Sequence, residues 1–289
     1  MIYKKLKTYV PERLAFAYTG ILLSLAAAVL SVTGYYYLYG FLRKVIVDMD
    51  IPGATPLAVR VVIFLVANTL VYFLAVLCTH VLGFRLEINL KKQGIRHLMN
   101  ASFSFYDRNE SGRIRKIIDD NTALTHSSIA HLIPDLTTAA FAPLLGILLT
   151  FYVDWRMGVL FTVSFLSGGL FILKMMGDQN FMSRYMAASD KMNSGAVEYV
   201  RGIHVLKIFK ANVRSLKDFY RSVADYSKLA LRYSMSCRNW YVLFQVLYNA
   251  VFLVTLFFGY GGDTEPRIQL AKFLYYALFN GVLYLALVY

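Results

Sequence analysis

The chain has 289 residues, of which 58% are hydrophobic and only 16% are charged, and its mean hydropathy is +0.51. These values exclude an ordinary soluble domain, which is about half apolar and about a quarter charged. The formal charge of +13 does not indicate a nucleic-acid-binding protein, because the Lys and Arg residues lie between long apolar runs. The composition therefore predicts a membrane protein.

Residues 1–13 predict a short surface, or elbow, helix that lies on the inner side of the membrane. Apolar residues recur every three to four positions from Ile2 to Leu14, and lysines stand between them. Pro11 suits the first turn of the membrane helix that follows. A cleaved signal peptide is the alternative interpretation, but the next uncharged run is about twice as long as the apolar part of a signal peptide.

Six segments without Asp, Glu, Lys or Arg follow, and each is long enough to cross a bilayer, which takes roughly 20 residues. They are residues 14–42, 61–84, 136–153, 157–173, 239–262 and 273–289. The two shortest, 157–173 and 273–289, have buried core helices as their alternative. We predict an all-α membrane protein in which residues 14–289 form six transmembrane helices.

The distribution of positive charge orients these spans, because cytoplasmic loops are enriched in Lys and Arg. With a cytoplasmic N-terminus, 24 of the 30 Lys and Arg residues lie on the inner side. We therefore expect a multi-pass protein of the cell membrane (plasma or inner) with its N-terminus in the cytoplasm. The outer connections are short polar segments with turn residues, such as DMDIPGATP at 48–56 and DWR at 154–156.

Two long insertions on the inner side, residues 85–134 and 174–238, predict cytoplasmic helical hairpins. In the second, apolar residues stand at helical spacing, as at Phe209, Val213 and Leu216. A helix rises about 1.5 Å per residue, so an arm of about 20 residues reaches roughly 30 Å beyond the bilayer. The tip of each hairpin is therefore a candidate contact for a cytosolic partner.

The residues at the two tips follow recognisable spacings. The first tip lies in SFYDRNESGRIRKIIDDN, residues 104–121, where eight of eighteen side chains are charged. There an aromatic pair precedes an acid and a Ser-Gly step: Phe105, Tyr106, Asp107, Ser111 and Gly112. In the second arm, a glutamate is followed after four, nine and eleven residues by a glycine, a base and an aromatic: Glu198, Gly202, Lys207 and Phe209. At both tips the sequence resembles the membrane domain of an ATP-binding cassette (ABC) transporter with the exporter fold.

The resemblance covers nearly the whole chain, because the surface helix, six spans and both hairpins agree in order and length. It implies that a short coupling helix at each tip seats in a groove of a cytosolic ATPase domain. The implied contact residues are Phe105, Tyr106, Asp107, Ser111 and Gly112, with Glu198, Val200, Gly202, Ile203, Val205, Lys207 and Phe209. Packing within their own hairpins is the alternative. The chain departs from the family pattern after Gly112, at Arg113, Lys116 and Ile117.

The resemblance also implies a dimer of membrane domains, identical or different, which moves a small molecule by alternating access. ATP and Mg²⁺ belong to the ATPase domains in the family, and these 289 residues contain no Gly-Lys step and so no phosphate-binding loop. The sequence LSGG at 166–169 matches part of the family's nucleotide-binding signature. It lies in an apolar membrane span that a nucleotide cannot reach, so we expect no nucleotide to bind there. We expect the nucleotide-binding domain to follow these residues or to be a separate chain.

Polar residues inside the spans are candidates for the translocation path, because such residues face a protein interior or a water-filled cavity. They are Asn68, Gln245, Asn249 and Asn280, with the neighbouring aromatics Tyr35, Tyr36, Tyr72 and Tyr248. Hydrogen bonds between packed helices and an interfacial aromatic belt are the alternatives. We find no catalytic pattern, the five histidines lack metal-ligand spacing, and two cysteines make no disulfide framework.

These observations predict the membrane half of an ATP-driven transporter for a small amphipathic or aromatic solute. Residues 130–144 and VDWR at 153–156 resemble a subgroup that contains siderophore importers, so a siderophore or metal chelate is one candidate solute. The expected partners are the bilayer, a second membrane domain, nucleotide-binding domains and the solute, but not nucleic acid. An ATP-independent six-span receptor or scaffold that binds a cytosolic partner is the alternative.

Overall fold

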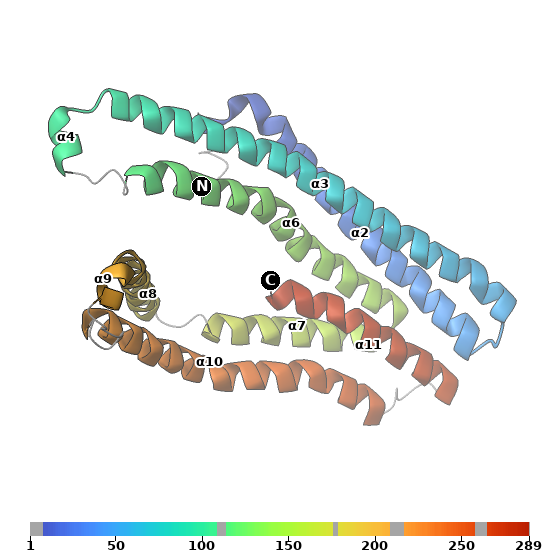
Figure 1. Cartoon of the computed structure of the whole chain (residues 1–289). Coiled ribbons are helices and arrows are strands. Elements are labelled where there is room, and N and C mark those ends of the chain that lie inside the picture. Colours follow the sequence, from blue (N-terminus) through green and yellow to red (C-terminus); the bar gives the residue numbers. More distant parts are fainter. Residues whose placement is uncertain (1–7, 109–113, 176–178, 209–216, 258–264, 289) are drawn as a thin grey trace. The chain divides into compact units, whose positions relative to one another are not determined.

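The computed structural model describes residues 8–108, 114–175, 179–208, 217–257 and 265–288. Within these ranges every element of regular secondary structure is a helix (Figure 1), which confirms the predicted all-α fold. The chain divides into two compact units. The first unit contains Met1–Phe161 and Val254–Tyr289, and the second contains Thr162–Leu253.

Long helices that pack along one another form the first unit. α2 (Leu14–Ile46), α3 (Ile51–Met99) and α6 (Asn121–Val153) are in mutual contact, and α11 (Pro266–Val288) lies against α2 and α6. The shorter elements of this unit are η1 (Pro11–Arg13), α4 (Phe103–Arg108) and η2 (Lys116–Asp120).

Small residues allow these helices to approach closely, as is usual for packed membrane helices. A Cβ atom at Gly83 of α3 would lie 3.1 Å from the backbone oxygen of His126 on α6. At Gly146 of α6, a Cβ atom would collide with the ring of Phe279 on α11. A larger residue at either position would push the helices apart. The buried cluster formed by α2, α3, α6 and the segment before α2 includes Val10, Ala17, Leu82, Leu86, Ile129 and Ile133.

The segment before α2 docks on α3. Val10 is fully buried, and Asn89 of α3 donates a 2.8 Å hydrogen bond to the backbone oxygen of Tyr9. Arg85 of α3 contacts Glu12 with 2.8 Å between Nε and Oε1. These contacts hold the described end of the expected surface helix against α3, while residues 1–7 lie outside the described ranges.

The turn between α2 and α3 is shorter than the sequence predicted. DMDIPGATP was expected to be a loop, but α3 begins at Ile51 and only residues 47–50 separate the two helices. Asp50 caps α3 by accepting a 2.9 Å hydrogen bond from the backbone N–H of Gly53. Pro52 fits there because the first turn of a helix does not need its N–H groups for intrahelical bonds. Turn-forming residue types therefore serve here as a helix start.

Between α6 and α7 (Trp155–Met175), Asp154 is the one non-helical residue. Its backbone is extended, with φ −159° and ψ 118°, and its Oδ1 accepts a 2.9 Å hydrogen bond from the N–H of Arg156. The short outer link predicted from DWR is thus an abrupt reversal capped by its own aspartate.

The described part of the second unit contains most of α7 and a helical hairpin with a short helix at its turn. α8 (Gln179–Arg201) leads into α9 (Ile203–Ile208), and α10 (Lys217–Phe257) returns along α8. Aromatic pairs join α8 to α10 at successive positions. These pairs are Phe181 with Tyr233, Tyr185 with Tyr226, and Tyr199 with Phe219.

The hydroxyl groups of Tyr185 and Tyr226 lie 3.0 Å apart, and this hydrogen bond raises the pKa of Tyr185 above its usual value. The aromatic pairs therefore combine ring packing with a polar contact, which favours one register of α10 on α8.

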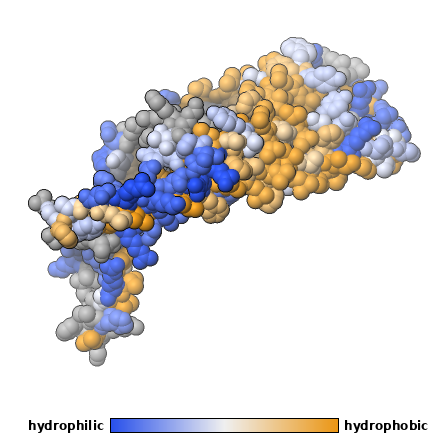
Figure 2. All heavy atoms as spheres, turned by 90° about the horizontal axis from the view of Figure 1, so that it is seen from above, coloured by the Kyte–Doolittle hydropathy of each residue, from blue (hydrophilic) through white to orange (hydrophobic). Residues whose placement is uncertain are grey.

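Four helices of the described residues are long and apolar enough to cross a membrane: Pro11–Ile46, Ile51–Met99, Ile117–Val153 and Trp155–Met175. They contain the first four predicted spans. The other two predicted spans fall in α10 and α11, together with residues outside the described ranges, so the count of six stays a prediction. Figure 2 shows apolar residues over a broad continuous surface with hydrophilic residues on either side of it. Such a surface suits contact with lipid.

Candidate functional site

The first predicted tip contains the short helix α4, at the turn where the chain leaves α3 (Figure 1). The Tyr106 hydroxyl donates a 2.7 Å hydrogen bond to the backbone oxygen of Leu98, which ties α4 back to the end of α3. The rings of Phe105 and Tyr106 meet edge to face, with centroids 5.5 Å apart. The aromatic pair of the motif is therefore engaged within its own hairpin, although Tyr106 remains 45% exposed.

The most exposed aromatic side chain of this tip is one that the sequence motif did not include. Phe103 is 92% exposed, and Met99 at the end of α3 is also largely exposed. In the sequence, the only sign that these two residues belong to the tip was their position close to the motif. Asp107 belongs to α4, but its side chain lies outside the described residues, as do Ser111 and Gly112.

The second predicted tip contains α9, which follows α8 after the turn residue Gly202. The N–H of Gly202 donates a 2.9 Å hydrogen bond to the backbone oxygen of Glu198. A Cβ atom at Gly202 would lie 3.3 Å from the same oxygen, so glycine permits this tight turn. Val200 before the turn is exposed, and Ile208 at the end of α9 is 76% exposed.

The other predicted residues of this tip are only partly described. Ile203 begins α9 and is half-buried. Val205 and Lys207 belong to α9, but their side chains lie outside the described residues, and Phe209 lies outside them altogether. The part of the tip that the structure describes therefore has two exposed apolar side chains, Val200 and Ile208.

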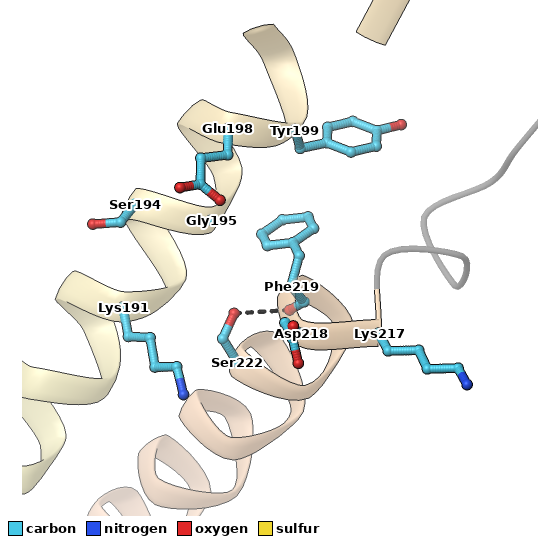
Figure 3. A pocket seen from close by; sticks show the side chains of 9 residues that line it. All are labelled: Lys191, Ser194, Gly195, Glu198, Tyr199, Lys217, Asp218, Phe219 and Ser222. Atoms are coloured by element: carbon cyan, nitrogen blue, oxygen red, sulfur yellow. Dashed lines mark hydrogen bonds between the residues drawn. The ribbon is translucent and has the colours of Figure 1, made fainter. Parts of the chain in front are cut away.

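Next to this tip, a cavity of about 540 Å³ lies between α8 and α10 (Figure 3). Phe219 points from α10 toward α8, and a Cβ atom at Gly195 would lie 2.9 Å from its ring. Tyr199 stacks on Phe219 with centroids 5.7 Å apart. Glu198, a motif residue, and Lys191 also line the cavity. Glu198 thus lines a cavity of its own hairpin, and its side chain is exposed.

A polar contact that the sequence did not predict joins α3 to α6. The Tyr72 hydroxyl donates a short hydrogen bond to Asp135. Further along α3, Thr79 donates a 2.6 Å hydrogen bond to the backbone oxygen of Ala130. Tyr72, expected to line the translocation path, is therefore held by a carboxylate of the neighbouring helix.

Three of the five histidines also come together between α3 and α6. Nδ1 of His80 lies 3.3 Å from Nε2 of His126, and the rings of His80 and His131 have centroids 5.0 Å apart. His126 also contacts Glu87 through Nδ1, at 3.1 Å. The described residues contain no group of three or more His, Cys, Asp or Glu arranged to hold a metal ion.

The remaining path candidates of the first unit fall into separate contacts. Tyr35 packs edge to face on Phe279 with centroids 5.1 Å apart, and Asn280, the next residue along α11, is buried. Tyr36 lies near Tyr152 at 6.1 Å, and Asn68 on α3 is half-buried.

Candidates of the second unit lie along one face of α10. Nε2 of Gln245 donates to the Tyr241 hydroxyl at 2.8 Å, and Asn249 donates to the backbone oxygen of Gln245 at 2.7 Å. Tyr248 is buried and packs on Phe244 with centroids 5.5 Å apart. These contacts fit the alternative of packing between and along helices, and the roles of these residues in transport stay predictions.

The sequence is similar to curated proteins whose names describe transport. It is 28% identical over 141 residues to the mycobactin import ATP-binding/permease protein IrtA of Mycobacterium tuberculosis, covering 48% of this chain and 16% of that protein. It is 25% identical over 149 residues to IrtA of Mycolicibacterium smegmatis, covering 51% of this chain and 17% of that protein. The matched part of this chain thus spans about a sixth of the length of these relatives.

The match to a protein family is far more extensive. The family model described as ABC transporter transmembrane region matches residues 17–287. This range takes in the long helices of both units, from the fourth residue of α2 to the last residue but one of α11. The chain therefore belongs to the ABC transporter transmembrane region family and is a multi-pass membrane protein.

Proposed function

We propose that this chain is the membrane half of an ATP-driven importer of a siderophore or another metal chelate, and that α4 and α9 couple it to cytosolic ATPase domains. The observation that carries the coupling role is common to both tips. Each tip has a short helix beside strongly exposed apolar side chains, Phe103 in the first and Ile208 in the second. Burial of apolar surface is the main favourable contribution to most protein–protein association.

The first tip is suited to transmit a displacement. The hydrogen bond from Tyr106 to Leu98 ties α4 to α3, which continues without interruption from Ile51 to Met99. A helix of 49 residues spans about 74 Å at about 1.5 Å per residue. A push on α4 would therefore act on a continuous lever that reaches from the tip to the opposite end of α3.

At the second tip, the aromatic pairs hold together α8 and α10, the two helices on either side of α9 in the sequence. Tyr199 and Phe219 join α8 to α10 near the turn, and the Tyr185–Tyr226 hydrogen bond joins them further along. Movement of α9 would be carried by both helices together, because the pairs resist sliding of one helix along the other. We propose alternating access driven by such movements at both tips, with the N-terminus in the cytoplasm.

The proposed partners follow from the family and from the relatives. The names of the relatives combine an ATP-binding and a permease activity, which supports ATPase domains as partners of the tips. We propose a second membrane domain as well, so that the translocation path lies between two such chains. The names also describe the import of mycobactin by these relatives, which supports a siderophore as the solute of this chain.

Transport measurements on the complete transporter in proteoliposomes test this proposal. We expect uptake of a ferric siderophore to require ATP and to stop with a non-hydrolysable ATP analogue. Vesicles that contain an ATPase-inactive variant of the partner domain are the matched control. Uptake at the same rate without ATP hydrolysis, or a purified complex that contains no ATPase, would contradict the proposal and favour a receptor or scaffold.

A further inference from the structure

A second cavity lies between α2, α3 and α6, near the α2–α3 and α6–α7 links. Its volume is about 470 Å³, within the range of small-molecule sites. Four of its lining residues are tyrosines and two are arginines: Tyr36, Tyr37, Tyr39, Tyr152, Arg43 and Arg60. The proposed orientation places this end of the helices at the outer face of the membrane.

The positive charge of this cavity has no counter-charge among the residues that line it. No acidic residue lines the cavity, and no described acid forms an ion pair with Arg43 or Arg60. The acids that follow Arg43 in the sequence, Asp48 and Asp50, contact Lys44 instead, at 3.2 and 3.3 Å. Both guanidinium groups therefore remain available to bind an anion. Each can donate two N–H hydrogen bonds to it.

Aromatic rings surround these charges. The guanidinium carbon of Arg60 lies 5.4 Å from the ring centroid of Tyr37, in a cation–π contact. Tyr36 meets Tyr37 edge to face at 5.4 Å and lies 6.1 Å from Tyr152. In the described part of the chain, no hydrogen bond engages the hydroxyl groups of Tyr36, Tyr37 or Tyr152. The rings offer stacking surfaces, and the hydroxyl groups offer donors to a bound solute.

We infer that this cavity binds a planar aromatic anion, such as an aryl carboxylate or phenolate group of the transported solute. The inference rests on the proposed transport function and adds to it a chemical class and a site of first contact. The anion would lie between Arg43 and Arg60, and its ring would lie among the tyrosines. The competing interpretation is an interfacial belt of Tyr and Arg that anchors the helices in lipid, which would show no preference among solutes.

A matched set of three probes tests this on the complete transporter in lipid nanodiscs, by equilibrium dialysis. 2-Naphthoate is a planar aromatic anion, 2-naphthamide has the same shape without charge, and cyclohexanecarboxylate has the charge without the aromatic ring. We expect 2-naphthoate to bind at least about tenfold more tightly than either of the others, because each lacks one of the two interactions. Equal binding of all three probes, or no binding of 2-naphthoate, would overturn the inference. This test needs only the parent protein.

Variants then locate the site. We expect Arg43→Gln and Arg60→Gln each to weaken 2-naphthoate binding by about tenfold, since each removes one charged hydrogen-bond donor. Gly40→Leu should abolish binding by filling the cavity, because a Cβ atom there meets Leu57 only at an ordinary 3.6 Å. Arg267→Gln removes an arginine that does not line the cavity and should leave binding unchanged. Parental binding by the first three variants would place the probe elsewhere and overturn the inference.

Transport assays on the same preparations separate this site from the proposed function. If the transporter takes up a ferric siderophore with ATP but does not bind 2-naphthoate, the site is wrong and the transport function stands. If 2-naphthoate binds as expected but no ATP-dependent uptake is measured, the site stands and the transport function is wrong.

Discussion

Lys272 of α11 and Asp154 of the α6–α7 link form a nearly buried ion pair, with 2.9 Å between Nζ and Oδ2. Their side chains are 11% and 10% exposed. The second oxygen of Asp154 accepts the Arg156 N–H, so one carboxylate caps α7 and also holds α11. The pair therefore joins the end of α6, the first turn of α7 and α11 at one point.

Removing only the lysine should be more harmful than removing both charges. We expect Lys272→Met to lower the free energy of unfolding by about 3 to 5 kcal/mol, because it leaves a buried carboxylate without its counter-charge. The double variant Lys272→Met with Asp154→Asn should recover most of that loss, since no buried charge remains. Denaturant unfolding of the protein in detergent micelles measures both. A double variant no more stable than Lys272→Met would contradict this account.

The Asp50 cap should give the first unit a component of pH-dependent stability. The N–H of Gly53 and then the ammonium group of Lys44 lower the pKa of Asp50 below its usual value. A lowered pKa stabilises the fold above the unfolded pKa of about 3.9, and this contribution is lost as the pH falls through the folded pKa. Asp50→Asn keeps a capping side chain but does not titrate.

We therefore expect the unfolding temperature of the parent to exceed that of Asp50→Asn at neutral pH, and this difference to shrink below about pH 4. Thermal unfolding followed by circular dichroism across this range measures it. Thr55→Ser, a nearby change that adds no charge, is the control. A difference that stays constant with pH would show that the carboxylate charge does not contribute.

Truncation of the tips should uncouple ATP hydrolysis from transport. Each large apolar side chain that fills a groove contributes about 1.5 to 3 kcal/mol. We expect Phe103→Ala, the double change of Phe105 and Tyr106 to Ala, and that of Val200 and Val205 to Ala to reduce transport and substrate-stimulated ATP hydrolysis together. Substrate binding should remain nearly unchanged.

The control for this series is Phe73→Ala, which removes an exposed ring from α3 far along the sequence from both tips. Rates are compared in proteoliposomes at matched expression and unfolding temperature. Phe103→Ala is the cleanest variant, because a side chain that is 92% exposed has little packing to lose. Parental transport by every tip variant would mean that the tips are not the coupling elements.

Cysteine labelling tests the orientation predicted from the charge distribution. In a background without Cys78 and Cys237, single cysteines at Asp50 and Asp263 should react with an impermeant maleimide added outside intact cells. Cysteines at Asn109 and Ser215 should react only after the cells are opened. Labelling at Asn109 from outside would reverse the orientation and end the coupling proposal.

Several features of the fold were predictable because they depend on local sequence. Uncharged runs of about 20 residues predicted the first four membrane helices, and DWR predicted the short link at Asp154. The start of α3 was not predicted, because Pro52 and Gly53 suit a loop as well as a helix start. Only the Asp50 cap distinguishes the two. Likewise, the tip motif pointed to Phe105 and Tyr106, but the exposure of Phe103 depends on how α4 folds back on α3.

By itself, the sequence determined the helical class and the membrane location, because hydropathy acts over short stretches of chain. The hairpin tips, read from charge and turn residues, stay a prediction. Only the tertiary structure decided which side chains meet. His80 and His126 are 46 residues apart, and Asp154 and Lys272 are 118 apart, yet both pairs are in contact. The physical reason is that such contacts depend on the rotation and register of one helix against another. Packing at residues such as Gly83 and Gly146 sets that register, and no local pattern contains it.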